Sequence, residues 1–231
     1  MPDLQGYGWL LLEGVRMTII VSLSSMGCTL VVGLVAAIGK LSHARLLHAV
    51  IELYTTIIRG IPELVLLLLV YYGVPTLIQD TAAAIGFKVA LSINPFVAGI
   101  GTLTIIYSAF ACEVYRAAYL AVPSGQRDAA AALGLNRVLA FRKVVLPQMI
   151  RYALPGLGNV WMVLVKATAL ISVIQLPELM RNADIAARST RMPFTFFFAA
   201  CLLYLVITLI SMWGQAGMER WARRGVADGA I

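Results

Sequence analysis

The chain has 231 residues, of which 61% are hydrophobic and only 13% are charged. Soluble domains carry about a quarter charged residues, so this composition excludes an ordinary soluble globular domain and indicates an integral membrane protein. The net charge of +7 would suit a nucleic-acid-binding protein, but in a membrane protein the placement of Lys and Arg reports orientation first.

Five apolar segments are long enough to cross a bilayer as helices, which takes about 20 residues each. We expect these spans at about residues 15–39, 49–73, 89–113, 152–176 and 192–218. Residues 76–94 are more polar, and we expect an interfacial connection there. The chain from 1 to 231 is therefore predicted to form one all-α membrane domain with its termini on opposite sides.

The positive-inside rule selects the orientation of such a domain. Basic residues of the connecting segments gather in the first loop, in the segment 116–151 and at the start of the tail, at Arg220, Arg223 and Arg224. The other side holds fewer basic residues, which acidic residues partly balance. We therefore expect the C-terminus inside the cell and the N-terminus outside.

The segment from Ser124 to Pro147 is polar, basic and alanine-rich, and the predicted topology places it in the cytosol. Ser124 is expected to cap a first short helix that Gly134 ends, because glycine is favoured just past a helix C-terminus. Asn136 is expected to cap a second helix, and Pro147 to interrupt it. The segment is thus predicted to form two short helices with a hinge.

Several charged residues lie within the predicted spans, where a charge is costly unless it is paired or faces water. Arg59 and Glu63 are four residues apart and are expected to pair; Glu113 and Arg116, three apart, are expected to do the same. For Glu113, contact with a cationic substrate is the alternative. Lys166 points either into a transport path or toward a carboxylate on another helix.

Three polar residues of the fourth span, Thr168, Ser172 and Gln175, are spaced to share one face of an α-helix. They would either line a polar route through the membrane or form hydrogen bonds between helices.

The sequence contains no H-E-x-x-H, G-x-S-x-G or G-x-x-x-x-G-K-[ST] signature, and its loops are too short for an enzyme core. The chain is expected to do no chemistry itself. If it moves a solute uphill, the energy must come from another subunit or from an ion gradient.

The spacing within the polar segment resembles the EAA loop of ABC importer permeases, which reads E-A-A, three residues, G, nine residues, I, one residue, L-P. Every spacing matches, with Asp in place of Glu and Val in place of Ile. The matching residues are Asp128-Ala129-Ala130, Gly134, Val144 and Leu146-Pro147.

Other segments resemble the polar amino acid permeases of this family. Arg59-Gly60-Ile61-Pro62 looks like their R-G-x-P segment. Tyr107 to Arg116 looks like A-Y-x-x-E-x-x-R-G, with departures at Ser108 and Ala117. Lys166 to Leu170 looks like K-x-T-S-L, with Ala169 in place of Ser. The subgroup that looks most similar carries histidine, lysine, arginine and ornithine, beside the octopine and nopaline importers.

This resemblance implies a type I ABC importer permease fold in the bacterial inner membrane, with the N-terminus periplasmic and the C-terminus cytoplasmic. Residues 124–147 would be the loop that couples the permease to an ATPase. The residues that the resemblance assigns to this coupling are Asp128, Ala129, Ala130, Gly134, Arg137, Val144, Leu146 and Pro147. Candidate residues of the translocation path or the substrate site are Arg59, Glu63, Glu113, Lys166, Thr168 and Ser172.

The implied partners are a dimer of a cytosolic ATPase, a second permease subunit and a periplasmic substrate-binding protein, which residues 178–191 could help to dock. The substrate would be a polar amino acid, a basic one or an opine, and lipid would surround the spans. ATP and Mg²⁺ would bind the ATPase, and this chain would bind neither a cofactor nor a metal.

Two alternatives remain at this point. An ion-coupled secondary amino acid transporter would use Glu113 or Lys166 to carry a proton. A helix-turn-helix reading of residues 124–147 would suggest DNA binding, but the flanking membrane spans disfavour it, and no nucleic-acid partner is expected.

Overall fold

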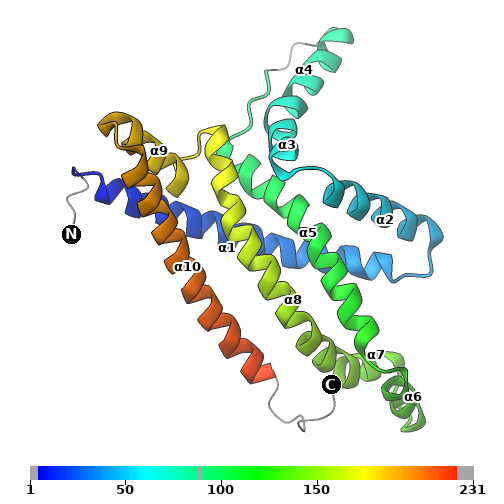
Figure 1. Cartoon of the computed structure of the whole chain (residues 1–231). Helices are drawn as coiled ribbons and strands as arrows, with labels where there is room; N and C mark the ends of the chain where they lie inside the picture. Colours follow the sequence, from blue (N-terminus) through cyan, green and yellow to red (C-terminus); the bar gives the residue numbers. More distant parts are fainter. Residues whose placement is uncertain (1–4, 88–89, 223–231) are drawn as a thin grey trace.

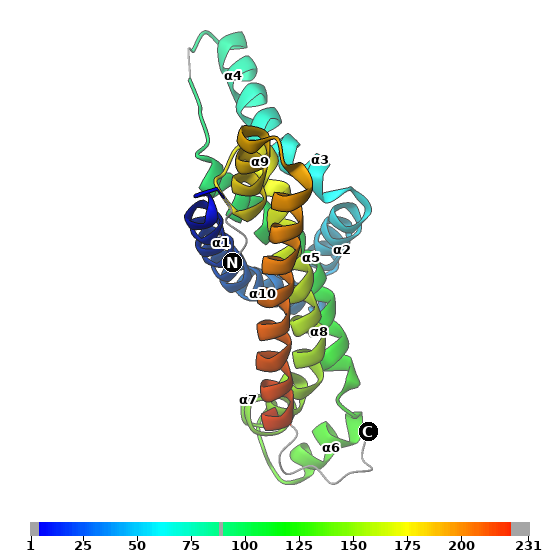
Figure 2. The same cartoon turned by 60° about the vertical axis from the view of Figure 1, so that its left-hand side comes forward.

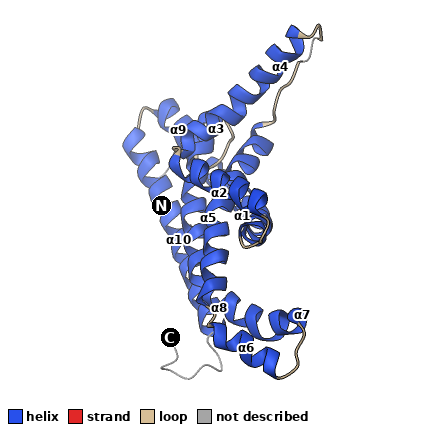
Figure 3. Ribbon diagram, turned by 90° about the vertical axis from the view of Figure 1, so that its right-hand side faces the viewer, coloured by secondary structure: helices blue, strands red, loops and turns tan. Residues whose placement is uncertain are grey.

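The computed structural model describes residues 5–87 and 90–222, and every regular element in these ranges is a helix (Figure 3). Five helical stretches in the described part of the chain have the length and apolar composition needed to cross a membrane. They are Gly8–Lys40, Glu63–Ala84, Pro95–Ala121, Arg137–Ile174 and Pro193–Ala222. The prediction of an all-α chain with five membrane-length apolar helices is confirmed.

The long helices form an elongated bundle in which α5 (Pro95–Ala121), α8 (Leu146–Ala167) and α10 (Pro193–Ala222) run roughly alongside one another, while α1 (Gly8–Lys40) crosses them obliquely (Figures 1 and 2). The face of α1 that meets α5 is made of small residues. A Cβ at Gly33 would lie 2.7 Å from the Cβ of Ala111, so glycine permits this close approach.

The predicted second span at 49–73 is wrong, because the chain leaves the helix at Ile61 and Pro62. Helix α2 (Arg45–Gly60) ends there, and the membrane-length helix follows as α3 (Glu63–Leu68), a π-helical turn η1 (Leu69–Gly73) and α4 (Val74–Ala84). Ile61 has φ −103° and ψ 137°, the extended conformation that a following proline imposes. Residues 76–84 therefore belong to a helix and not to a connection.

The third span begins later and ends later than predicted. Asn94 caps α5 by accepting a hydrogen bond from the backbone N–H of Phe96 at 2.8 Å, and the helix continues to Ala121. Glu113 and Arg116 consequently lie inside the helix and not at its end. The predicted start at residue 89 lies outside the described residues, as do Arg223 and Arg224 of the tail.

The fourth membrane-length helix, in contrast, starts earlier than predicted, because Pro147 does not interrupt it. The helix begins as α7 (Arg137–Ala140), passes through a π-helical turn η2 (Phe141–Val145) into α8, and tightens into the 3₁₀ helix η3 (Thr168–Ile174). Pro147 lies in the first turn of α8, directly after the π-helical turn, where proline is tolerated.

Two short helices lie at opposite ends of the bundle. Helix α9 (Leu179–Thr190) packs against α1 and α10 at one end, and α6 (Ser124–Ala132) protrudes with α7 at the other (Figures 1 and 2). The polar segments before the fourth and the fifth long helix are thus far apart in space.

Candidate coupling loop and charged cavity

The polar segment 124–147 has the predicted form of two helices and a hinge. Gly134 ends α6 with φ +75°, a left-handed conformation that glycine adopts without strain, and the N–H of Leu135 donates back to the carbonyl of Ala130 at 3.1 Å. Asn136 caps α7 by accepting from the N–H of Leu139 at 2.9 Å. The helix-ending role of Gly134 and the cap at Asn136 are confirmed.

Ser124 does not cap α6, which corrects the sequence prediction. Pro123 holds the capping position with an extended ψ of 136°, and Ser124 is already the first helical residue. Arg127 of α6 donates a hydrogen bond to the hydroxyl of Tyr119 at 3.1 Å, and this bond links α6 to α5.

Much of the loop surface faces outward. Asp128, Ala129, Gly134, Arg137 and Pro147 are exposed, whereas Ala130 is buried and Val144 and Leu146 are half-buried. Exposed apolar side chains stand among the charges, with Leu133 80% and Val138 73% exposed. A slim helix that combines exposed apolar and charged side chains can dock onto a soluble partner.

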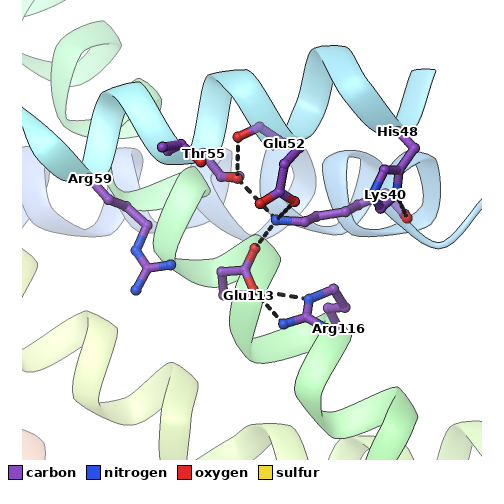
Figure 4. A pocket seen from close by; sticks show the side chains of 8 residues that line it. Lys40, His48, Glu52, Thr55, Arg59, Glu113 and Arg116 are labelled. Carbon is purple, nitrogen blue, oxygen red and sulfur yellow. Dashed lines mark hydrogen bonds and ion pairs between the residues drawn. The ribbon is translucent and has the colours of Figure 1, made fainter. Parts of the chain in front are cut away.

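A second candidate site is a cavity of about 330 Å³ between the end of α1, one face of α2 and the middle of α5 (Figure 4). We call it the charged cavity. Its lining is almost entirely polar or charged and consists of Lys40, His48, Glu52, Thr55, Thr56, Arg59, Glu113 and Arg116.

Lys40 connects the three helices around the charged cavity (Figure 4). Its side chain is only 6% exposed, and its ammonium forms ion pairs with Glu52, at 2.7 Å, and with Glu113. It also donates to the hydroxyl of Thr55 at 3.1 Å. The second carboxylate oxygen of Glu113 pairs with Arg116 at 2.9 Å, which confirms the predicted pair on α5.

The Lys40 network was not predicted, because the sequence places Lys40 at the end of a span, 73 residues from Glu113. The hydrogen bond from the Lys40 ammonium lowers the pKa of Glu52, so the carboxylate is held in its charged form. The cluster therefore alternates in sign, from Glu52 through Lys40 and Glu113 to Arg116.

The predicted pair between Arg59 and Glu63 is wrong, because the break at Pro62 puts the two residues on different helices. Glu63 accepts a hydrogen bond from the hydroxyl of Tyr107 at 2.9 Å. The guanidinium carbon of Arg59 lies 5.4 Å from the ring centroid of Phe110 and lines the charged cavity.

The remaining candidates do not join this cavity. Lys166 is exposed and forms no ion pair among the described residues. Thr168 is fully buried and donates to the carbonyl of Val165 at 2.7 Å, and Ser172 donates to that of Ala169 at 2.6 Å. Thr168 does not share a face with Ser172 as expected, because η3 has three residues per turn and not 3.6.

Glu178 is a buried carboxylate that the sequence placed in an exposed segment. It accepts hydrogen bonds from the N–H groups of Met180 and Arg181, at 2.9 and 2.7 Å, and from the hydroxyl of Tyr204 at 3.0 Å. Burial raises the pKa of Glu178 to about 7, although these hydrogen bonds oppose the shift. An acidic residue directly before a helical stretch is the sequence signal for this cap, because the helix dipole favours a negative charge at the N-terminus.

The chain is similar to known transport proteins over most of its length. Residues 29–224 match the family described as the inner membrane component of binding-protein-dependent transport systems. The chain is 42% identical to the histidine/lysine/arginine/ornithine permease protein HisQ of Escherichia coli, over 96% of this chain and 97% of the relative. It is 41% identical to the nopaline permease protein NocQ of Agrobacterium fabrum, over 96% and 94%.

A crystal structure of an amino acid ABC transporter with histidines superposes with a TM-score of 0.81 at 34% identity, covering 93% of this chain and 94% of that chain. The methionine transporter MetNI, at 21% identity and a TM-score of 0.71, shares the fold. The match over most of the sequence and the helical architecture agree, and the chain belongs to the family of inner membrane components of binding-protein-dependent transport systems.

Proposed function

We propose that this chain is the permease subunit of an ATP-driven importer for polar amino acids, with basic amino acids or opines as substrates. The observation that carries the proposal is the exposed loop 124–147, which combines the spacing of the permease family with a glycine-ended helix at the tip of the bundle. The relatives named for histidine, lysine, arginine, ornithine and nopaline support the substrate class.

The loop would seat α6 in a cleft of a cytosolic ATPase dimer. Ala129 leaves the exposed side of α6 slim, Asp128 would take the place of the family Glu, and Arg137, Arg142 and Lys143 supply positive charge for acidic groups of the partner. ATP and Mg²⁺ would bind the ATPase, and this chain would need no cofactor. Motion of the loop would reach the membrane through α7 and α8, which form one continuous helical path.

The basic loop and tail support an orientation with the C-terminus cytoplasmic and the N-terminus periplasmic. Helix α9 would then face the periplasm, where the binding protein delivers the substrate. Large apolar side chains of α10 are exposed, among them Leu205 and Ile210, and would contact lipid or a second permease subunit, which is a similar chain or a second copy.

The alternative of proton coupling through Glu113 is disfavoured by the charged cavity. Lys40 and Arg116 engage both carboxylate oxygens of Glu113. A proton carrier needs an oxygen that is free to exchange its proton.

Replacing Gly134 with Asp tests the coupling role. Gly134 has φ +75° and nothing within 4 Å of a Cβ, so the variant is expected to fold in the membrane but to present a strained, negatively charged hinge to the ATPase. We expect at least a tenfold loss of ATP-dependent amino acid uptake in vesicles, by the loss of coupling, and a loss of ATPase co-purification.

Gly86→Asp is the matched control, because Gly86 also has a positive φ of +88° and open space around it, but it lies far from the loop. This variant should keep its ATPase and its uptake. Normal uptake by the Gly134 variant, or uptake that follows a proton gradient without any ATPase, would refute the proposal.

A further inference from the structure

One cation of the charged cavity pairs with no carboxylate of the described residues. Lys40 pairs with Glu52 and Glu113, and Arg116 pairs with Glu113. Arg59 lines the same cavity and forms no ion pair within the described ranges of the chain. With His48 neutral, the lining carries one surplus positive charge.

Arg59 is held in place without an anion. Its guanidinium lies over the ring of Phe110, and a cation above an aromatic face is attracted by the ring quadrupole. Its position in the last turn of α2 also favours a cation, because the helix dipole is negative at that end. These two interactions explain why a charge is stable at residue 59, but they leave the hydrogen-bond donors of the Arg59 guanidinium available. In Figure 4 the side chain reaches from α2 toward α5.

The nearest acidic residue in sequence cannot take up these donors. Glu63 begins the next helix, beyond the break at Pro62, and binds the hydroxyl of Tyr107. The two carboxylates of the cavity, Glu52 and Glu113, already pair with Lys40 and Arg116.

We propose that the guanidinium of Arg59 binds the carboxylate of the transported amino acid in the charged cavity. Guanidinium and carboxylate form a bidentate pair that is stronger than neutral hydrogen bonds. Thr56, three residues earlier on α2, lines the same cavity and offers its hydroxyl as a second donor. The cavity, at about 330 Å³, lies at the small end of the range of about 300–1,000 Å³ for ligand pockets.

This inference rests on the proposed function and adds a specific contact to it. The carboxylate is common to all amino acids, so Arg59 would recognise the class and not one side chain. The paired carboxylates Glu52 and Glu113 would not need to release Lys40 for this contact to form.

The test compares L-arginine with agmatine, which is arginine without its carboxylate. The permease complex, co-purified with its native subunits, is placed in phosphatidylcholine nanodiscs without the binding protein, and binding is measured by isothermal titration calorimetry. We expect arginine to bind at least about tenfold more tightly than agmatine, and Arg59→Gln to remove this difference by weakening arginine binding without weakening agmatine binding. If Arg59 had a purely structural role, its replacement would weaken the binding of both ligands equally.

Arg45→Gln is the matched control, because Arg45 lies on the same helix α2 but outside the cavity lining. It should keep the preference for arginine. A second series in nanodiscs with phosphatidylglycerol distinguishes a lipid headgroup: competition by this lipid that depends on Arg59 would overturn the proposal. So would a preference for arginine that survives Arg59→Gln, or no preference in the wild type. ATP-dependent uptake by the same complexes, reconstituted into sealed proteoliposomes with the binding protein, would show that the proposed function itself still holds.

Discussion

Replacing Lys40 with Met is expected to destabilise the protein by about 3 kcal/mol, because it leaves the carboxylate of Glu113 without its main partner in a largely buried site. The Glu113 side chain is 19% exposed, and the Lys40 side chain is 6% exposed. Arg116 remains beside Glu113 and limits the loss. The free energy of unfolding, measured by denaturant titration in mixed micelles, checks this value.

Two companion variants show which contact of Lys40 accounts for the loss of stability. Glu52→Gln should cost less than Lys40→Met, because the side chain of Glu52 is 52% exposed and water replaces its partner. Adding Glu113→Gln to Lys40→Met should recover part of the loss, because the uncompensated carboxylate is then gone. If Lys40→Met costs no more than Glu52→Gln, the ion pair between α1 and α5 does not stabilise the bundle.

The local features of the chain were predictable, because neighbouring residues determine them. The pair of Glu113 and Arg116 follows from helical spacing alone, and the hinge at Gly134 follows from the preference of glycine for a left-handed conformation. The five apolar helices follow from length and composition. None of these features depends on how distant segments pack.

The features that were not predicted correctly depend on a helix break or on how distant segments pack. The sequence does signal the helix break at Pro62, and this break puts Arg59 and Glu63 on different helices. No signal placed Lys40 beside Glu113, because that contact results from the packing of α1 against α5. The tightening into a 3₁₀ helix at Thr168 likewise has no marker in the sequence.

Replacing Glu178 with Ala is expected to cost about 3 kcal/mol, because it removes the cap of α9 and leaves two backbone N–H groups and a tyrosine hydroxyl without their acceptor. Glu178 is fully buried where α9 meets α1 and α10. The loss should appear as a lower unfolding midpoint of the purified protein. Asp184→Ala, on the same helix but with a partly exposed carboxylate that pairs with Arg188, is the control and should cost less than about 1 kcal/mol.

The same carboxylate should make stability depend on pH. Its pKa is raised from 4.5 to about 7 in the folded protein, so between these values the folded chain binds a proton that the unfolded chain has released. Stability from Glu178 is therefore complete below pH 4.5 and is lost as the pH rises to about 7. Glu178→Gln cannot release a proton, so its unfolding free energy should fall less steeply than that of the wild type across this window. Parallel pH profiles for the two proteins would show that Glu178 is charged in the folded state and that its hydrogen bonds outweigh its burial.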